Sequence, residues 1–436
     1  MMEIPARHPR VGNCLIREVI PTSGRVKVLV DYPGLGLRRR PEYLDELVDC
    51  RTGARVELKA PAPRLAPSGN IPAPPPTWQS ARQTLLALRL GQSTADSVTE
   101  LSVGMGEVDS ACRWALNRAA TGQLSFLLFE SPYGMGKSHA LAQLKQHGFK
   151  QSMAVGTVTL DGAGITLCEP MTLLSGLAHA IEFADERHDE GLPQRLSQRA
   201  GVGLSITGGD LLHKLLTAMS RECADNPDKW ERIEDYLALD ATSADLRREL
   251  GIQVPALRAR RREERPERCC TVIREWASAC TVLGARNGLV VLLDEADVDY
   301  AQGGRTANDR EQRTALLRGF RSVADAQPAY GGFARLVIAM AITPGASKPD
   351  PILELKAELG SHLRVVKLQE LSAGELMDLG KRVAQLYCRG YEIKRDDAKA
   401  DNAVRECVQL TERQAEGRNP RRFIRLLLEK LDVLYA

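Results

Sequence analysis

Short apolar runs alternate with helix-forming segments from Trp78 to the C-terminus. The run 288–293 is continuously apolar, which is typical of a strand buried on both faces of a parallel sheet. Segments 80–90 and 108–120 have helical patterns and precede the first strand candidate. The strand candidates are 124–129, 153–160, 288–293, 335–342 and 361–369. This alternation predicts an α/β fold built on a parallel sheet.

The first 77 residues follow another pattern. Two β-rich runs, 13–20 and 25–31, are joined by the turn sequence Pro-Thr-Ser-Gly at 21–24. We predict a small SH3- or Tudor-like β-barrel over 1–58, a fold that binds peptides, proteins or nucleic acid. The proline-rich stretch 59–77 predicts a stiff, extended linker that separates this barrel from the rest of the chain.

Two mostly helical regions interrupt or follow the predicted core, which spans 78–370. The first is an insertion at about 165–285, and the second is a C-terminal helical lid at 371–436. The charged run 258–265 mixes signs, which favours a solvated helix face over a nucleic-acid-binding patch.

Two helix starts in the lid have strong capping signals. Ser372 and Glu375 have the spacing of a capping box. Asn419 is a candidate N-cap, and Pro420 suits the first helical position. The apolar residues that then share one face of the last helix are Phe423, Leu427, Leu431 and Leu434.

The segment Ser-Pro-Tyr-Gly-Met-Gly-Lys-Ser at 131–138 lies between a strand candidate and a helical segment. A glycine-rich loop at this place directs backbone N–H groups at a phosphate. We predict that Lys137 reaches the β- and γ-phosphates of a nucleotide and that Ser138 binds Mg²⁺. Ser131 stands where the full pattern has glycine. The predicted nucleotide-contacting residues are Pro132, Tyr133, Gly134, Met135, Gly136, Lys137, Ser138 and His139.

An acidic pair, Asp294 and Glu295, follows the apolar run 288–293. A carboxylate at the tip of a strand beside the phosphate loop is suited to Mg²⁺, and we assign Asp294 to this role. Glu295 is then placed to polarise the attacking water as general base. The alternative is that both acids simply begin a helix, where negative charge is favoured. Asp297 and Asp299 are predicted to be surface acids.

Three further side chains are candidates for the same site. Thr343 follows the strand candidate 335–342, where it would contact either the γ-phosphate or the nucleophilic water, or only cap the loop. Arg421 and Arg422 lie in the first turn of the last helix, where cations oppose the helix dipole. This local penalty points to an anion as their partner, although solvated surface arginines remain an alternative.

Composition narrows the class of protein. The chain has 436 residues, 43% of them hydrophobic, and a formal net charge of +3. No window approaches a membrane span, and the N-terminus lacks the pattern of a signal peptide, so we expect a cytoplasmic protein. The ten cysteines include no CxxC pair, which disfavours zinc ribbons and suits reduced thiols. Residues 7–40 carry an excess of Lys and Arg, either as a phosphate-binding surface or as a solvated basic loop.

The order of these motifs resembles that of an AAA+ ATPase, on the STAND and origin-recognition side of that superfamily. More narrowly, residues 80–436 are similar to the BREX-system P-loop ATP-binding proteins, the BrxD-like family of bacterial phage defence. The stretches that carry this resemblance are Leu-Ser-Val-Gly-Met-Gly at 101–106, Pro-Tyr-Gly-Met-Gly-Lys-Ser at 132–138, Ala-Ile-Thr-Pro-Gly at 341–345 and Asn-Pro-Arg-Arg at 419–422.

The resemblance implies an ATPase core with a helical lid, Thr343 as the sensor of the γ-phosphate, and Arg421 or Arg422 as the lid arginine. It also implies assembly into a homo-oligomer in which a neighbour supplies an arginine. Arg364 is the candidate for that arginine, and Arg318 and Arg321 are alternatives. The distance of about 150 residues between Lys137 and Asp294 is longer than a minimal core and requires the helical insertion.

The sequence therefore predicts an ATP- and Mg²⁺-dependent AAA+-like hydrolase of a bacterial defence or DNA-processing system. Its expected partners are further copies of the chain and a helicase, nuclease or methyltransferase, with DNA as a further candidate and no membrane. One alternative is a nucleotide-gated switch with negligible turnover. The other is a DNA clamp or loader, or a transposition-type ATPase.

Overall fold

The protein is described here from a computed structural model of all 436 residues. The chain divides into two compact units, Met1–Pro74 and Pro75–Ala436. The predicted turn at 21–24 and all but the last residue of the predicted linker at 59–77 lie outside the residues that the structure describes. The described residues are 4–8, 12–20, 27–32, 37–43, 48–49, 77–92, 94–162, 164–184, 190–200, 210–223, 227–303, 306–325, 335–345, 350–413 and 418–435.

The N-terminal unit contains a five-stranded antiparallel sheet with the strand order β4-β3-β2-β1-β5. Irregular registers interrupt the β2–β3 and β3–β4 pairs, as expected where a small sheet is bent. Closure of this sheet into a barrel stays a prediction. Its strands are β1 (Ile4–His8), β2 (Gly12–Ile20), β3 (Lys27–Tyr32), β4 (Leu37–Tyr43) and β5 (Val48–Asp49).

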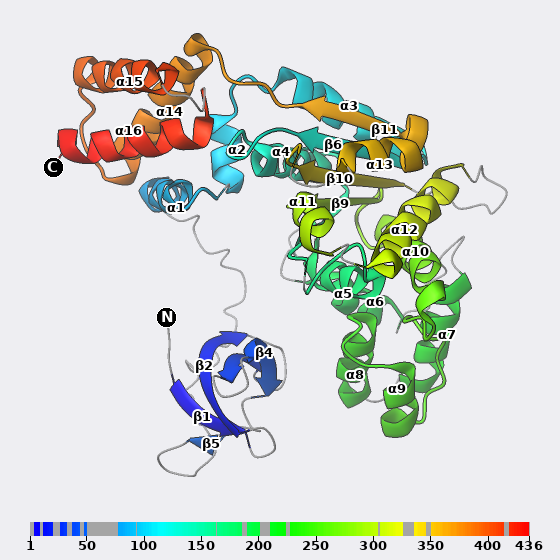
Figure 1. The fold of residues 1–436 in the computed structure, drawn as a ribbon. Coiled ribbons are helices and arrows are strands. Elements are labelled where there is room, and N and C mark those ends of the chain that lie inside the picture. The colour runs from blue at the N-terminus through cyan, green and yellow to red at the C-terminus, as the bar shows by residue number, and fades with distance from the viewer. Residues whose placement is uncertain are drawn as a thin grey trace. The chain divides into compact units, whose positions relative to one another are not determined.

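The larger unit is a mixed α/β structure around a six-stranded sheet with the order β11-β6-β10-β9-β7-β8 (Figure 1). Its first five strands are parallel, and only the two-residue edge strand β8 is antiparallel to its neighbour. The strands are β6 (Ser125–Glu130), β7 (Ala154–Thr159), β8 (Ile181–Glu182), β9 (Leu289–Asp294), β10 (Leu336–Ile342) and β11 (Leu363–Lys367). The five predicted strands are confirmed, and β8 was not predicted.

Helices of this unit cover both faces of the sheet, and other helices lie in the ranges 165–285 and 371–436, which the sequence predicts as an insertion and a lid. The α-helices are α1 (Thr77–Arg89), α2 (Ala95–Leu101), α3 (Gly106–Ala120), α4 (Lys137–Lys150), α5 (Pro170–Ala180), α6 (Leu192–Ala200), α7 (Asp210–Cys223), α8 (Pro227–Leu237), α9 (Ser243–Leu250), α10 (Arg265–Val282), α11 (Ala296–Val298), α12 (Ala307–Asp325), α13 (Pro351–Leu359), α14 (Ala373–Gly390), α15 (Asp397–Glu412) and α16 (Pro420–Tyr435). Shorter turns are the 3₁₀ segments Arg262–Glu264 and Gly360–His362 and the π segment Asp299–Gly303.

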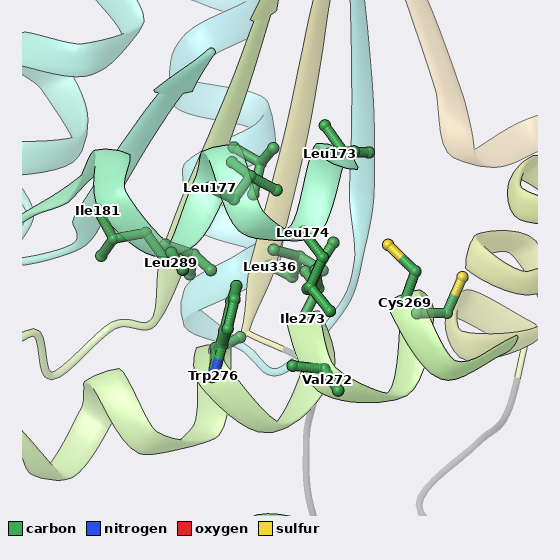
Figure 2. Close-up of a cluster of buried hydrophobic side chains, with 14 of the residues drawn as sticks. Leu173, Leu174, Leu177, Ile181, Cys269, Val272, Ile273, Trp276, Leu289 and Leu336 are labelled. Atoms are coloured by element: carbon green, nitrogen blue, oxygen red, sulfur yellow. The ribbon is translucent and has the colours of Figure 1, made fainter. Parts of the chain in front are cut away.

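The sheet is buried on both faces because alternate residues of each strand pack into different clusters. In β6, Phe126 and Leu128 join the cluster that includes α5 and α10, whereas Leu127 and Phe129 join the cluster that includes α3 and α4. This explains why the strands read as continuous apolar runs. Figure 2 shows α5 and α10 meeting over the sheet through Leu173, Leu174, Leu177, Val272, Ile273 and Trp276, next to Leu289 and Leu336.

The helices α14, α15 and α16 of the predicted lid, called the lid below, share a hydrophobic cluster that is separate from the clusters on the sheet. This cluster joins α14, α15 and α16 to α1, which contributes Ala81 and Leu85 (Figure 1). The predicted core range of 78–370 thus contains a helix whose apolar side chains pack with the lid. The capping box of Ser372 and Glu375 is confirmed at the start of α14. Asn419 Oδ1 accepts hydrogen bonds from two backbone N–H groups in the first turn of α16, which confirms it as the N-cap.

The charged run 258–265 is not a helix face, and this prediction is wrong. Residues 258–261 have irregular backbone, a 3₁₀ turn follows over Arg262–Glu264, and α10 begins at Arg265. Pro266 lies in the first turn of α10. Because proline has a fixed φ and no N–H group, it suits a helix start and places the preceding charges outside the helix.

Within the part of the chain that the structure describes, no helix has the length and apolarity needed to cross a bilayer.

Candidate functional site

The glycine loop after β6 has the backbone geometry that its sequence requires. Gly134 and Gly136 have φ angles of 83° and 95°, in the left-handed region that glycine adopts at little cost. Gly136 is the N-cap of α4, so the first N–H groups of the helix face the loop. Ser131 is buried and its Oγ donates to the Pro132 carbonyl at 3.2 Å, so a side chain is accommodated where the full pattern has glycine.

Lys137 spans the loop and reaches the neighbouring strand. Its Nζ donates hydrogen bonds to the carbonyl oxygens of Ser131 and Pro132, at 2.9 and 3.3 Å, and to Thr343 Oγ1 at 3.0 Å. Burial lowers the pKa of Lys137, and the nearby carboxylates of Asp297, Asp294 and Glu295 oppose this shift. All three acceptors are uncharged. An anion at the loop would therefore offer this ammonium group stronger partners than it has here.

The strand order explains why these groups meet. β10 lies between β6 and β9, so Thr343, just beyond the end of β10, stands between the glycine loop and the acidic pair. Thr159 at the end of β7 is in register with Asp294 at the end of β9. In an open parallel sheet, ligands bind outside the carboxyl ends of the strands where the order of connections reverses. The sheet therefore gathers at one edge the side chains that the sequence separates by some two hundred residues, as Lys137 and Thr343 show.

Glu295 has an unusual backbone conformation for its residue type. Its φ is 54°, its side chain is exposed, and its N–H donates to Asp294 Oδ1 at 2.9 Å. A non-glycine residue in the left-handed region costs on the order of 1 kcal/mol, and such strain is concentrated at functional sites. The strained turn separates the two acids of the pair: Asp294 ends β9, and Glu295 precedes α11.

Asp297 is half-buried at the same edge, so the prediction of a surface acid is wrong at this position. Its Oδ1 accepts a hydrogen bond from the N–H of Thr343 at 3.3 Å, and it is the carboxylate that most raises the pKa of Lys137. The single turn of α11 places Asp297 next to the end of β10. The sequence pattern does not predict this position.

Asp299 is fully buried, so the prediction of a surface acid is wrong here also. Its carboxylate accepts hydrogen bonds from Thr166 Oγ1 and, at 3.2 Å, from the N–H of Leu167. Burial raises the pKa of Asp299, and the hydrogen bond from Thr166 opposes this shift. Because Asp299 opens the π turn that follows Asp294 and α11, this contact ties the acidic strand tip to the start of the helical insertion.

A cavity of about 1140 Å³ connects these groups. This volume is large enough for a nucleoside triphosphate. Most of the predicted contact residues line it: Tyr133, Gly134, Met135, Gly136, Lys137, Ser138, His139, Asp294, Glu295, Thr343 and Arg421. Pro132 and Arg422 are not among its lining residues within the described part of the chain.

Sequence reasoning missed one wall of this cavity. It comes from the segment before the glycine loop and from the lid, and it is mainly apolar: Leu88, Leu90, Leu101, Val103, Met105, Val108, Leu371, Leu379 and Ile424. The stretch 101–106, with Gly104 and Gly106, supports the family resemblance but does not by itself predict a wall of the cavity. The sequence signal that could have predicted this wall is the set of apolar residues shortly before the glycine loop. Ligand pockets are lined mainly by apolar side chains, and a nucleotide base would need such a surface.

The lid contacts the glycine loop directly. Asn419 Nδ2 donates to the Tyr133 carbonyl at 3.0 Å. The Arg421 guanidinium lies 5.0 Å from the centre of the Tyr133 ring and also donates to its hydroxyl oxygen. The Arg421 side chain fills the space beside Gly91. A Cβ atom added to residue 91 would lie 2.2 Å from the Arg421 guanidinium group. The lid arginine is therefore held between the loop and the end of α1.

The three arginines considered for action in trans have partners within the chain. Arg364, in β11, lies over the Trp114 ring at 5.7 Å. Arg318 makes a two-pronged ion pair with Glu358, at 2.8 and 3.2 Å. Arg321 Nε forms an ion pair with Asp325 Oδ2 at 3.4 Å. None of the three lines the cavity described above. Which of them acts on a neighbouring copy stays a prediction.

His139 is expected to make the stability of the folded protein depend on pH. Burial lowers its pKa from the ordinary 6.5 to about 4. The folded state therefore binds fewer protons than the unfolded chain between these values, so His139 makes stability fall as the pH drops from 6.5 toward 4. We expect the free energy of unfolding to fall by about 1–2 kcal/mol more between pH 7 and pH 5 in the wild type than in His139→Gln. Urea unfolding of both proteins at the two pH values measures this, and parallel losses would contradict it.

Comparison with known proteins finds distant structural likenesses only. A chain of the HORMA:CdnC:Trip13 complex of E. coli MS115-1 is 11% identical, with 74% of this chain and 80% of that chain covered and a TM-score of 0.34. The Aeropyrum pernix ORC2 protein in its ADP form is 15% identical, with 77% and 65% covered and a TM-score of 0.40. Its ADPNP–ADP complexes give 16% identity, 76% and 68% coverage and a TM-score of 0.34.

Likenesses this distant assign neither a family nor an activity. No protein-family model matches the sequence, and no curated protein matches it.

Proposed function

We propose that the protein binds and hydrolyses ATP as an AAA+-like P-loop ATPase. The observation that carries this proposal is the position of the Lys137 ammonium group. It bridges the glycine loop and Thr343 at 3.0 Å, beside the carboxylates of Asp294, Glu295 and Asp297, in one cavity. A lysine, a cluster of carboxylates and a set of helix N–H groups around one cavity match the needs of a triphosphate and its cation.

Each side chain then has a distinct role. Lys137 and the N–H groups at the start of α4 hold the phosphates. Thr343 contacts the γ-phosphate or the attacking water, and Glu295 accepts the proton of that water. The residues present also suit Mg²⁺, because Ser138 and Asp294 offer hard oxygen ligands on the same cavity. When bound, Mg²⁺ would neutralise charge on the phosphates.

A second candidate function is a nucleotide-gated switch with negligible turnover. It is favoured by the contact of the lid with the loop through Asn419, Arg421 and Tyr133. If Arg421 exchanges Tyr133 for a phosphate when a nucleotide binds, the lid moves relative to the core. A single-turnover assay separates the two functions: a switch binds ATP with Lys137-dependent affinity and releases it intact.

Removal of the Tyr133 hydroxyl tests whether Arg421 must change partners. Tyr133→Phe keeps the ring but removes the oxygen to which Arg421 donates. We expect this change to raise ATP affinity about two- to fivefold. In the variant, Arg421 does not have to break a hydrogen bond to Tyr133 before it binds a phosphate. Arg421→Ala should instead lower the affinity. Equilibrium titration with a fluorescent ATP analogue measures both, and a loss of affinity in both variants would contradict the exchange.

We propose further that this ATPase acts in a bacterial defence or DNA-processing system, as the resemblance to the BREX-system proteins implies. Homo-oligomerisation and recruitment of a helicase, nuclease or methyltransferase belong to the same proposal. The DNA clamp or loader alternative makes a separate prediction: DNA affinity that falls steeply with salt. Titration of duplex DNA at two salt concentrations tests it, and no binding at low salt removes it.

A further inference from the structure

The backbone just beyond β10 is held from two sides. The N–H of Ser131, in the glycine loop, donates to the carbonyl oxygen of Ile342 at 3.3 Å. On the other side, the N–H of Thr343 donates to Asp297 Oδ1, also at 3.3 Å. Between these two contacts, Thr343 Oγ1 accepts a hydrogen bond from Lys137 Nζ at 3.0 Å. The Thr343 hydroxyl is therefore carried on a short piece of backbone that two other segments hold in place.

The contact with Asp297 is the one that fixes Thr343 itself. β10 ends at Ile342, so pairing with the neighbouring strands does not reach Thr343. Asp297 is half-buried and lines the same cavity as Thr343 and Lys137. A carboxylate that accepts from a backbone N–H makes a charge-assisted hydrogen bond, which is stronger than one between neutral groups. None of the roles in the proposed hydrolysis is assigned to Asp297.

The position of this hydroxyl decides what Thr343 can contribute. An ionised phosphate only accepts hydrogen bonds, so the Thr343 hydroxyl would have to donate to it. A hydrogen bond weakens steeply once its distance and angle depart from their preferred ranges. A shift of the backbone at Thr343 by about 1 Å would therefore remove most of the contribution, although the hydroxyl would still be present.

We propose that Asp297 is a positioning residue that acts through Thr343, by holding its backbone N–H so that its hydroxyl meets the γ-phosphate of ATP. This inference rests on the proposed function, and it assigns Thr343 to the γ-phosphate and not to the attacking water. The γ-phosphate is the part of ATP that ADP lacks. Asp297 thus helps the site to distinguish ATP from ADP without touching either nucleotide.

A competing explanation is that Asp297 serves only as a counter-charge for Lys137. Burial lowers the pKa of Lys137, and Asp297 is the carboxylate that most opposes this shift. The two explanations predict effects of opposite sign. Removal of a negative charge beside the phosphates would strengthen nucleotide binding, and it would favour ATP, the more highly charged ligand. Loss of positioning would instead weaken the binding of ATP alone.

Nucleotide discrimination in the full-length protein separates these explanations. Equilibrium titration with Mg²⁺ gives dissociation constants for ADP and for a non-hydrolysable ATP analogue, and the ratio of the first to the second is the readout. We expect Asp297→Ala to lower this ratio about three- to tenfold, the effect of one hydrogen bond. Asp297→Asn has the same shape and keeps an acceptor oxygen without the charge. We expect its ratio to equal or exceed that of the wild type.

A double-mutant cycle tests whether Asp297 acts through the hydroxyl. Thr343→Val removes Oγ1 but keeps the backbone N–H that donates to Asp297. We expect this variant to lower the ratio as well. The double variant Asp297→Ala/Thr343→Val should then have the same ratio as Thr343→Val, because no hydroxyl remains to be positioned. Additive losses would show that the two residues act separately and would overturn the inference.

The remaining outcomes also decide the matter. The inference is wrong if the ratio in Asp297→Ala is at or above the wild-type value, or if Asp297→Asn loses as much as Asp297→Ala. It is also wrong if Thr343→Val leaves the ratio unchanged, a result that does not depend on how the Asp297 variants fold. In each of these cases, ATP binding that requires Lys137 leaves the ATPase assignment standing. If the wild type binds neither nucleotide, the proposed function itself fails.

Discussion

Lys137→Met is expected to weaken ATP binding by about a hundredfold or more and to abolish measurable turnover. The ammonium group is the cation that spans the loop and Thr343, and charge-assisted hydrogen bonds to phosphate are worth about 1.5–3 kcal/mol each. Methionine keeps the length and apolar character of the stem, so the loop loses its charge and little of its packing. Equilibrium dialysis with ATP measures the affinity.

Although Lys137→Met weakens ATP binding, we expect it to leave the stability of the fold unchanged or to raise it. Burial lowers the pKa of Lys137, which means that the folded protein bears a cost for holding this ammonium group charged. We therefore expect the melting temperature of Lys137→Met to equal or exceed that of the wild type. Lys150→Met, at the exposed end of the same helix, is the matched control and should leave both properties unchanged. A destabilised Lys137→Met protein would show that the lysine holds the fold and not the ligand.

Glu295→Gln is expected to slow ATP hydrolysis by about 10²–10⁴-fold while ATP still binds. This range is the usual contribution of a positioned general base, and glutamine has the shape of glutamate without its basicity. The variant should therefore accumulate bound, unhydrolysed ATP. Glu107→Gln is the matched control, because Glu107 lines the same cavity from the first turn of α3. Single-turnover hydrolysis of radiolabelled ATP measures the rate.

A second change at the same position separates chemistry from backbone strain. Glu295 has a φ of 54°, which glycine adopts without strain. Glu295→Gly should thus be as inactive as Glu295→Gln but equally or more stable than the wild type, by up to about 1 kcal/mol. Hydrolysis at the wild-type rate in either variant would contradict the role of Glu295 as general base.

Much of the fold was predictable because its strands are buried on both faces. An apolar run such as 288–293 has few alternatives to a central strand, and the flanking helices have clear caps at Ser372 and Asn419. β8 was missed because a two-residue strand leaves no pattern. The run 258–265 was wrongly predicted to be a helix face because it mixes charges of both signs, whereas Pro266 places the start of α10 at the end of this run.

The sequence predicts those parts of the site that depend on short, contiguous segments, but not the parts that depend on tertiary structure. The loop around Gly134 and Gly136 has a signature of its own, and the acids follow a recognisable strand. The environments of Asp297 and Asp299 depend instead on one turn of α11 and a π segment that fold them toward β10 and the insertion. No periodic pattern encodes such a turn. The apolar wall of the cavity was missed for the same reason, because it joins α1–α3 to a lid more than 250 residues away, as the contact of Arg421 with Leu90 shows.

The central claim is that a triphosphate lies in the loop between β6 and α4, opposite the carboxylates of Asp294 and Glu295 at the end of β9. A crystal structure of the protein with Mg²⁺ and a non-hydrolysable ATP analogue tests this most directly. The account predicts that the γ-phosphate lies within hydrogen-bond distance of Lys137 Nζ and that the cation contacts Ser138 and Asp294. An analogue bound elsewhere, or a loop still closed by Lys137 on the Ser131 and Pro132 carbonyls at saturating analogue, would contradict it.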